Sequence, residues 1–446
     1  MLRKLTFIFV LALLFGTFLV VRPYFNKQEE YPRIEDRLPD ADFIATADCI
    51  RLAREISGMM FYYKVAYRDF LTPEFVLSQA KNYGLNLQKP MFVFVNKDGE
   101  YGILTELTDS TKLGSGIEKL HHFFDVQEFQ IDEQKIYKIK EHNVYLFYGK
   151  DYICFYKGEF LKKRVKRIVE AKTNQVTPMW MELINQQRYL NKSVVLYSHL
   201  QDFDQLNVNQ AIAYPAIDST KIVFHAYLAT KDTVPFKMKE GGKMFVSGDF
   251  TKTFVNLHLD PSYLQAHPEH PINNYLLKQS ARIRFPYKDF INRWDGDIVF
   301  QQGGWINVQE KYIESVLDDD FNVSEIEKTR TVKASGFSAY YSLKRKSSDF
   351  IELLQKNGFL TMQEDKYHLL LSPPLNLKEN KDFSHTFYAT STTPKMIPSS
   401  NSFVKWMHKG TQYTVMVDSI KTFELYGNLS FSMEQILKKK NIADNF

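Results

Sequence analysis

One stretch of the chain gathers histidine and carboxylate side chains that could bind zinc. The candidate ligands are His258, Asp260, His267, Glu269 and His270. Imidazole nitrogens and carboxylate oxygens are ligands that Zn²⁺ accepts. Prolines in the same stretch oppose a regular helix, so these side chains would converge only if the loop folded for that purpose. An ordinary polar loop is therefore the favoured interpretation, and no metal ligand is assigned.

Two serine–lysine pairs have the spacing that places a nucleophile and a lysine base on adjacent helical turns. They are Ser78 with Lys81 and Ser402 with Lys405. Neither pair is accompanied by the S-D-N and K-T-G sequences that complete this kind of active site. The chain also lacks the G-x-S-x-G, P-loop, dinucleotide-binding and H-E-x-x-H patterns. These observations lower the expectation of an enzyme, and no catalytic residue or cofactor is assigned.

Residues 318–324 resemble the start of a calcium-binding loop, with side-chain oxygens at its positions 1, 3, 5 and 7. Position 6 is Val323, where such loops need glycine, and position 12 is Thr329, where they need glutamate. A solvated acidic loop or helix cap is therefore favoured over a calcium site.

A further segment is apolar on nearly every face. The candidate surface for a partner or a lipid within it consists of Met59, Met60, Phe61, Tyr62, Tyr63 and Tyr67. Such a segment needs cover from all sides, because exposed apolar patches are costly in water. The cover is either the protein's own core, which is the favoured interpretation, or a partner or an acyl chain.

Residues 160–169 predict an amphipathic helix with an apolar stripe and a basic face. The basic face consists of Lys162, Lys163, Arg164, Lys166 and Arg167. On a membrane-anchored protein this face could lie against anionic headgroups. The favoured alternative is a helix that covers a sheet and keeps its charges in water.

The N-terminus predicts how these elements are placed in the cell. An uncharged apolar run extends from Leu5 to Val21, between Lys4 and Arg22. As a helix its 17 residues rise about 26 Å, slightly less than the roughly 30 Å hydrocarbon core of a bilayer. The run ends without the small residues of a cleavage site. We therefore expect residues 1–24 to form an uncleaved signal anchor, rather than a cleaved signal or a buried soluble helix.

The short N-terminal tail predicts a cytoplasmic start, with the bulk of the chain exported to the periplasm as a single-pass inner-membrane protein. Residues 25–40 are polar and contain two prolines, so they predict a tether. The scarcity of cysteine fits an oxidising compartment. For Cys49 and Cys154, two free thiols are favoured over a disulfide.

Composition limits the class of protein. At about 150 residues per domain, 446 residues predict two to three domains. Lysine and arginine number 57 and aspartate and glutamate 52, which leaves a net charge of only +5. A dedicated nucleic-acid-binding domain is far more basic. The two cysteines exclude a disulfide scaffold and a Cys-rich zinc module.

The exported part predicts an α+β fold of mostly antiparallel sheet with packed helices. Asp98-Gly99 lies between two strand-like runs and predicts a hairpin over residues 91–107. Three short strands over residues 136–156 predict a meander. The apolar spacing predicts helices over residues 48–57 and near 73–83.

The same order of elements recurs further along the chain. Residues 254–258 stand where 43–46 stood, helices are expected at 261–266 and 273–281, and residues 298–308 predict the second hairpin. The offset grows from about 211 to about 233, which one insertion near residues 310–338 explains. The predicted domains are a first α+β unit at 41–190 and a second similar unit at 191–446. The latter includes a β-rich extension at 191–250.

A family resemblance rests on four features of the chain. They are the anchor, the strand start at Asp40 to Phe43, the Leu-Gln-Lys-Pro-Met-Phe-Val-Phe-Val segment at 87–95 and the repeated layout. The chain resembles uncharacterised membrane-anchored envelope proteins of Bacteroidetes-type bacteria with tandem α+β repeats. The resemblance covers most of the exported part and rests on pattern. It implies an envelope location and transfers no catalytic residue.

These observations favour a non-enzymatic envelope protein whose exported part binds another envelope component. One alternative is a lipid- or lipoprotein-handling module in which the segment from Met59 onward contacts the lipid. Another is an exported hydrolase without a recognisable motif.

Overall fold

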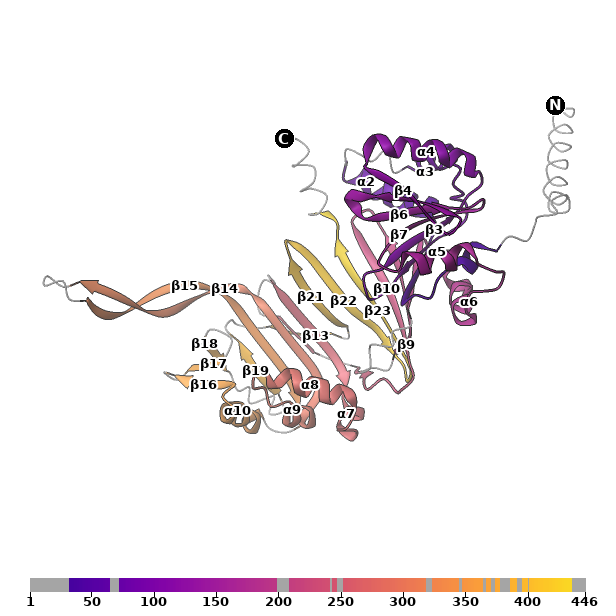
Figure 1. The fold of residues 1–446 in the computed structure, drawn as a ribbon. Helices are drawn as coiled ribbons and strands as arrows, with labels where there is room; N and C mark the ends of the chain where they lie inside the picture. The colour runs from indigo at the N-terminus through magenta and orange to yellow at the C-terminus, as the bar shows by residue number, and fades with distance from the viewer. Residues whose placement is uncertain are drawn as a thin grey trace, which may run out of the picture. The chain divides into compact units, whose positions relative to one another are not determined.

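The chain has an α+β fold with a large antiparallel sheet (Figure 1), which confirms the predicted class. The computed structural model describes residues 32–64, 72–198, 208–240, 243–246, 252–317, 323–344, 347–363, 366–369, 374–377, 386–390, 395–399 and 401–434. Within these ranges no helix is long and apolar enough to cross a membrane. The predicted anchor at 1–24, with its apolar run at 5–21, lies outside the described residues.

The chain divides into two compact units, which do not follow the sequence in two simple blocks. Unit 1 comprises Met1–Ala41 and Gln79–Gln186, and unit 2 comprises Asp42–Ser78 and Gln187–Phe446. Helix α3 (Pro73–Asn82) carries the chain from one unit to the other.

Unit 1 is an antiparallel sheet with the strand order β2–β3–β7–β6–β5–β4. The strands are β2 (Met91–Val95), β3 (Tyr101–Glu106), β4 (Val126–Ile131), β5 (Gln134–Ile139), β6 (Val144–Tyr148) and β7 (Tyr152–Lys157). The predicted hairpin and meander are confirmed. Gly99 has a φ of 82°, the left-handed conformation that the turn between β2 and β3 requires.

Helices accompany this sheet in unit 1. They are η1 (Ile34–Arg37), α4 (Ser110–Phe123), η3 (Lys140–His142), α5 (Leu161–Val169) and α6 (Pro178–Ile184). Asp109 caps the N-terminus of α4 by accepting a hydrogen bond from the Thr111 backbone N–H. Leu113 and Ile117 of α4 are buried in one cluster with strand residues such as Leu146. Helix α4 therefore covers the sheet with the apolar side that its sequence spacing provides.

Unit 2 contains a long antiparallel sheet with the strand order β1–β8–β9–β10–β23–β22–β21–β13–β14–β15–β19–β18–β17–β16. Its first strands along the chain are β1 (Phe43–Ala47), β8 (Val194–Ser198), β9 (Val208–Ile217), β10 (Lys221–Thr230), β13 (Thr253–Asp260), β14 (Trp294–Leu317) and β15 (Val323–Leu343). Those that follow are β16 (Leu360–Gln363), β17 (Lys366–Leu369), β18 (Pro374–Leu377), β19 (Thr386–Thr390), β21 (Ser402–His408), β22 (Thr411–Ile420) and β23 (Glu424–Ser432). Three short strands, β11 (Lys237–Met238), β12 (Lys243–Val246) and β20 (Lys395–Pro398), complete the unit.

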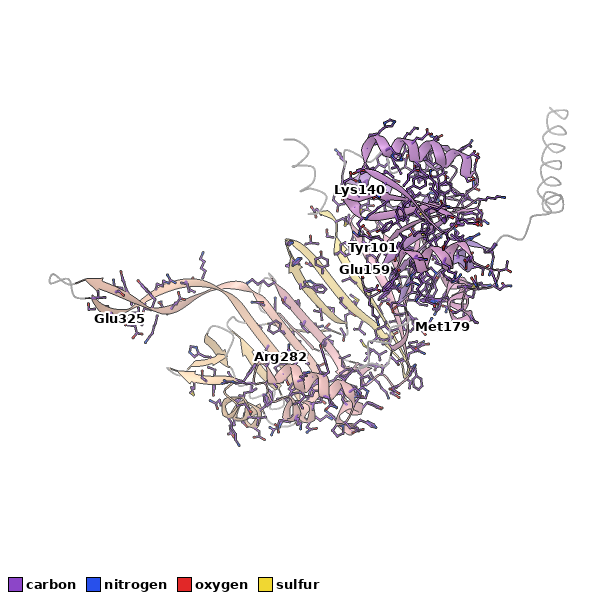
Figure 2. All side chains as sticks on the ribbon, in the orientation of Figure 1. Tyr101, Lys140, Glu159, Met179, Arg282 and Glu325 are labelled. Carbon is purple, nitrogen blue, oxygen red and sulfur yellow. The ribbon has the colours of Figure 1, made fainter. Side chains whose placement is uncertain are left out.

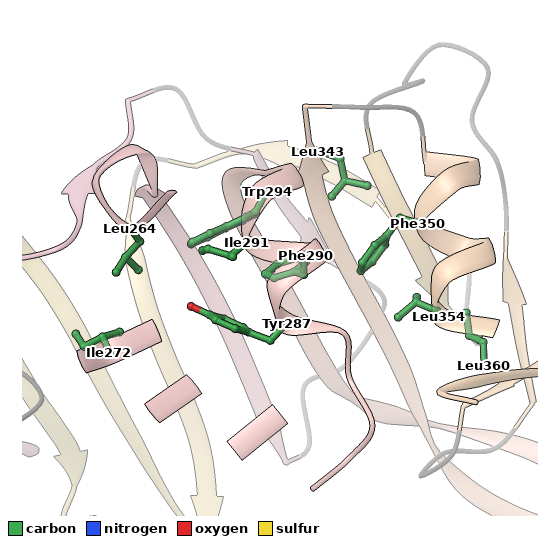
Figure 3. Packing of buried hydrophobic residues seen from close by; sticks show 10 residues of the cluster. All are labelled: Leu264, Ile272, Tyr287, Phe290, Ile291, Trp294, Leu343, Phe350, Leu354 and Leu360. Carbon is green, nitrogen blue, oxygen red and sulfur yellow. The ribbon is translucent and has the colours of Figure 1, made fainter. Parts of the chain in front are cut away.

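Helices of unit 2 form its largest described apolar cluster (Figure 3). They are α7 (Ser262–Ala266), α8 (Pro271–Ala281), α9 (Tyr287–Arg293) and α10 (Ser347–Lys356), while α2 (Cys49–Tyr62) and η4 (Gln187–Tyr189) precede them along the chain. The ring of Phe290 stacks on Trp294 at 5.8 Å and meets Tyr341 edge-on at 5.2 Å. Strand residues Leu259 and Ile298 pack against the same cluster. These helices therefore cover one face of the sheet at β13 to β15.

The hairpin predicted over residues 298–308 is wrong. β14 runs without a turn from Trp294 to Leu317 and pairs with β15 over almost its whole length. Instead of reversing the chain, Gly303 and Gly304 lie where the pairing register shifts between Gln302 and Trp305. Paired glycines suit a β-bulge as well as a turn, so the dipeptide alone does not distinguish the two.

Both cysteines are free thiols, as favoured from the sequence. Cys154 on β7 is fully buried, and burial raises the pKa of its thiol well above the ordinary value. Burial, reinforced by the negative charge of Asp48, raises the pKa of Cys49 to about 11. Both thiols therefore stay protonated near neutral pH.

Two glycines of unit 1 offer a matched test of its packing. A Cβ on Gly102 would lie 2.2 Å from the ring of Phe94, whereas a Cβ on Gly114 in α4 would meet nothing within 4 Å. We expect Gly102→Ala to cost about 1–3 kcal/mol through overpacking. Gly114→Ala should instead stabilise the helix by up to about 1 kcal/mol. Thermal unfolding of both variants checks the pair, and equal effects of the two changes would contradict the packing described.

Candidate functional site

The predicted basic face lies on α5, and the structure divides it into two groups. Lys162, Lys163 and Lys166 are exposed, so their charges are in water. Arg164 and Arg167 are partly buried and bind other parts of unit 1. Three lysines, rather than five cations, are therefore presented to solvent by this face.

Arg164 forms a buried ion pair with Glu100. Its Nε and Nη2 each donate to the Glu100 carboxylate at 2.6 Å, and the Glu100 side chain is 1% exposed. Tyr156 Oη and the Asn96 side-chain amide also donate to this carboxylate. Burial alone would raise the pKa of Glu100, but the hydrogen bonds from Arg164, Tyr156 and Asn96 outweigh it and hold the pKa below its ordinary value.

Arg167 is also used inside unit 1. Its guanidinium donates to the backbone carbonyl of Asp36 at 3.0 Å and to the Gln175 side chain. Asp36 belongs to η1, so Arg167 helps to attach the end of the predicted tether to α5. The favoured interpretation, a helix that keeps its charges in water, therefore describes the three lysines, whereas both arginines make contacts within unit 1 that the sequence did not predict.

The predicted apolar segment begins in the last turn of α2, where Met59 to Tyr62 are helical and Tyr63 follows the helix. Met59 is only 3% exposed and is in one cluster with Met60, Tyr63, Ile217 and Ile222. The side chains of Phe61 and Tyr62 are instead exposed, at 47% and 60%. Tyr67 lies outside the described residues. The segment is thus partly core and partly surface.

One face of the sheet in unit 2 is apolar and only partly buried. Successive side chains of a strand point to opposite faces, so the register assigns every second residue of β10, β23, β22 and β21 to this face. We call it the apolar strand face, and ten of its large apolar members are Ile222, Phe224, Leu228, Leu425, Leu429, Phe431, Tyr413, Val415, Val404 and Trp406. These ten are partly exposed, and Val415 near the middle is 36% exposed. The register also places Ala226, Gly427 and Val417 on this face, with Ser402, His408 and Thr411 at the ends of their strands.

Aromatic rings cross this face from strand to strand. Trp406 stacks on Tyr413 at 5.4 Å, Tyr413 lies 5.5 Å from Phe431, and Phe431 stacks on Phe224 at 6.2 Å. Four neighbouring strands contribute one ring each. The row gives the face a continuous apolar surface with rigid side chains, which costs little conformational entropy on binding.

The predicted apolar segment adjoins the apolar strand face. Ile222 belongs to the face and also packs against the cluster of Met59 on α2. The helical part of this surface was predicted from the sequence, and the strand part was not. The available signal was the alternation of Val404 with Trp406 and of Tyr413 with Val415, which is typical of strands with one apolar face.

The three histidines and Asp260 of the candidate zinc stretch are held by other partners. His258 Nδ1 lies 2.9 Å from Asp297 on the neighbouring strand, and its ring is fully buried. His267 Nδ1 bonds the Tyr263 carbonyl at 2.9 Å, and His270 caps α8. Asp260 accepts hydrogen bonds from Ser262. Across the described residues, no group of three or more His, Cys, Asp or Glu side chains is placed to hold a metal ion.

Neither serine–lysine pair has the arrangement of a nucleophile and its base. Ser402 and Lys405 lie on strand β21, where a spacing of three residues places them on opposite faces. Ser78 is helical, but its hydroxyl donates to the Phe75 carbonyl at 2.8 Å. The calcium-like stretch lies mostly outside the described residues, and its Val323 begins β15.

Comparison with known proteins gives no family. No family model matches the chain, and no curated protein matches it. Solved structures of TP0453 are similar over part of the chain. Crystal form III has a TM-score of 0.31 and 11% identity, and covers 46% of this chain and 83% of TP0453. Crystal form IV has a TM-score of 0.30 and 11% identity, with 44% and 79% covered. A likeness this distant carries no conclusion about function.

The division of the basic face can be tested by comparing neighbouring cations. Arg164→Met leaves Glu100 buried without its ion-pair partner, and we expect a loss of about 3–5 kcal/mol in stability. Lys163→Met on the exposed side should change stability by no more than about 0.5 kcal/mol. Thermal unfolding of the two variants measures the difference, and similar losses would contradict the buried pair.

The stability lost in Arg164→Met should depend on pH through Glu100. Because the folded pKa of Glu100 is lowered, its stabilising effect is complete above the unfolded pKa of about 4.3. It is lost as the pH falls through the lower folded value. The gap in stability between the unsubstituted chain and Arg164→Met should therefore narrow as pH falls below about 4.3. A gap that stays constant over this range would rule out Glu100 as the group involved.

The openness of the apolar strand face predicts tolerance to substitution. Val415→Ser should change stability by about 0.5 kcal/mol or less, as expected for a surface position. Phe350→Ala, in the cluster of Figure 3, should cost about 3–5 kcal/mol. Chemical denaturation of both variants checks this contrast, and a comparable loss at Val415 would mean that the face is part of a closed core.

Proposed function

We propose that this chain is a single-pass inner-membrane protein whose exported part binds another envelope component without catalysis. The partly exposed apolar strand face is the observation that carries this proposal. Its chemistry favours an acyl chain, either of a free lipid or of a lipoprotein, as the group that is bound. The protein would then be a lipid- or lipoprotein-handling module of the envelope.

Three properties of the face support an acyl chain over a polar ligand. Its ten large members are aliphatic or aromatic, and the polar side chains on the same face, Ser402, His408 and Thr411, lie at the ends of β21 and β22. The aromatic row offers an extended surface across four strands, which suits a long unbranched chain. The half-buried Met60 packs against the same cluster as Ile222. Methionine side chains adapt readily to ligands of variable shape.

We also propose that the chain contains two similar α+β repeats that arose by duplication. These repeats differ from units 1 and 2 and from the predicted boundary at residue 191, because β8, β9 and β10 belong to the first repeat. The order β2–β3–β7–β6–β5–β4 in unit 1 has its counterpart in β14–β15–β19–β18–β17–β16. Likewise β1–β8–β9–β10 has its counterpart in β13–β21–β22–β23. β10 and β23 therefore occupy equivalent places in the two four-stranded sets, β1–β8–β9–β10 and β13–β21–β22–β23. They pair with each other about a centre at which His225 lies opposite Asn428.

Residues 5–21 support the proposed membrane location, since they form an uncharged apolar run long enough to span a slightly thinned bilayer. The exposed side of α5 would add to membrane attachment. Lys162, Lys163 and Lys166 can attract anionic headgroups, each worth about 1 kcal/mol near the surface. The envelope location is also what the resemblance to Bacteroidetes-type envelope proteins implies.

In-cell photo-crosslinking tests the acyl-chain proposal on the full-length protein. The photoreactive residue p-benzoyl-phenylalanine replaces Val415, or replaces Gln412 as a matched control. Gln412 is exposed on the same strand but points to the opposite face. The cells are grown with an alkyne-bearing palmitate, and the label is read after irradiation. We expect alkyne label on the protein at position 415 and little at position 412.

The size of the adduct identifies the source of the acyl chain. A small mass shift indicates a free lipid, and a protein-sized shift indicates a lipoprotein. Equal labelling at the two positions, or an unlabelled protein partner at position 415, would overturn the acyl-chain proposal.

A further inference from the structure

The β14–β15 hairpin extends well beyond the sheet from which it starts (Figure 1). β13 pairs with β14 as far as Gln302, and β19 pairs with β15 from Ser338 onward. Beyond these residues, in the described part of the chain, the two strands pair with each other alone. We call residues 303–317 and 323–337 the arm. The corresponding turn in unit 1 takes only residues 96–100.

Three apolar side chains of the arm are largely open to water. Ile313 is 65% exposed, Val323 is 68% exposed and Ile326 is 44% exposed. Figure 2 shows side chains standing out along the ribbon, including the labelled Glu325. A two-stranded hairpin of this kind is at best marginally stable in water, and its open edges are ready to pair with another strand.

Charges on the arm are balanced and paired across the ribbon. The cross-strand ion pairs are Arg330–Glu310 at 2.7 Å, Lys328–Glu314 at 2.5 Å and Lys311–Glu327 at 3.0 Å. Residues 307–316 and 323–333 together carry four acidic and four basic side chains. A partner selected by net charge, such as an anionic membrane or a nucleic acid, therefore fits the arm poorly.

The charges are nevertheless ordered along β15. Glu325 and Glu327 come first, and Lys328, Arg330 and Lys333 follow. A second copy of β15, placed antiparallel, would set its basic half against this acidic half. The sequence of this strand is therefore complementary to itself.

Symmetry restricts the register of such a pair. In an antiparallel pair with a two-fold axis, opposite residues lie on the same face, so one residue must face its own copy at the axis. An axis at Glu327, Lys328 or Arg330 would set a charge against its own copy. These three registers are therefore disfavoured.

An axis at Thr329 places a neutral residue against its own copy. On each side of the axis, it sets Glu325 of one copy against Lys333 of the other, and Ile326 against Val332. Opposite charges and apolar side chains that face each other directly both stabilise a strand pair. This register therefore uses the order of charges along β15.

The same register brings two cations of β15, Lys328 and Arg330, opposite each other. Each of them already has a carboxylate on β14, because Lys328 pairs with Glu314 and Arg330 pairs with Glu310. These carboxylates offset the repulsion between the two cations. Among the described residues, neither Glu325 nor Lys333 has an ion pair within the arm. In this register they therefore gain a partner of opposite charge, whereas Lys328 and Arg330 keep the partners that they already have.

We propose that the arm pairs with the arm of a second copy of this chain, through the outer edge of β15, with a two-fold axis at Thr329. The result is a four-stranded antiparallel sheet that covers one open edge of each copy. This self-association goes beyond the proposed acyl-chain binding and does not depend on it.

Cysteine crosslinking of the full-length protein in its native membrane tests the register. Residues opposite each other in an antiparallel pair have Cα atoms about 4.5–5.5 Å apart, which suits a disulfide. We expect Thr329→Cys to form a dimer under mild oxidation, and reductant should reverse it. Ser315→Cys is the control, because Ser315 is an exposed residue of the other strand, near the same end of the arm. It should give little dimer.

The unsubstituted chain reports any background from its own cysteines, which are buried or half-buried thiols. Equal crosslinking at positions 315 and 329 would indicate random collision. No dimer at position 329 would show that the arms do not meet there. Either result overturns the proposal.

A charge exchange in the Thr329→Cys background gives a second measurement. Lys333→Glu sets a new carboxylate against Glu325 at two symmetric places, so the dimer yield should fall about fivefold or more. Adding Glu325→Lys restores opposite charges and should restore the yield. Both positions are exposed, so the folded chain should be unaffected, and thermal unfolding verifies this. If the double charge variant gave as little dimer as Lys333→Glu alone, the proposed register would be excluded.

Discussion

Backbone hydrogen bonding between β10 and β23 is the constraint on which the rest of unit 2 depends. β10 is the last strand of the set β1–β8–β9–β10, and β23 is the last strand of the set β13–β21–β22–β23. Without their mutual pairing, each strand would leave a row of unpaired N–H and C=O groups at its edge. The pairing runs from Lys221 opposite Ser432 to Ala229 opposite Glu424. It brings Phe224 beside Leu429 and makes one continuous apolar surface from strands of both sets. The candidate binding surface is therefore a product of how the two sets join.

Local signals accounted for much of the fold. The Asp98-Gly99 turn, the meander and the apolar spacing of the helices each depend on residues close together in the sequence, and each prediction was confirmed. The paired glycines Gly303 and Gly304 show the limit of this reasoning, because a bulge and a turn need the same residue type. What decides between them is whether partner strands continue beyond the dipeptide, which is a property of the whole sheet.

The candidate site was less predictable for a related reason. Phe224 and Phe431 are about 200 residues apart, so only the sheet register places their rings together. On α5 the sequence showed five cations on one side of a helix. It could not show that Glu100, from a different hairpin, removes Arg164 from that side. Helical spacing predicts on which side of a helix a residue lies, but whether that residue is buried depends on the tertiary contacts of that side.

The two free cysteines have a consequence for reactivity. Neither Cys49 nor Cys154 is part of a covalent bridge, so the described fold does not depend on a disulfide. The thiolate is the form that oxidants and alkylating reagents attack, so the raised pKa of both thiols makes them poor nucleophiles near neutral pH.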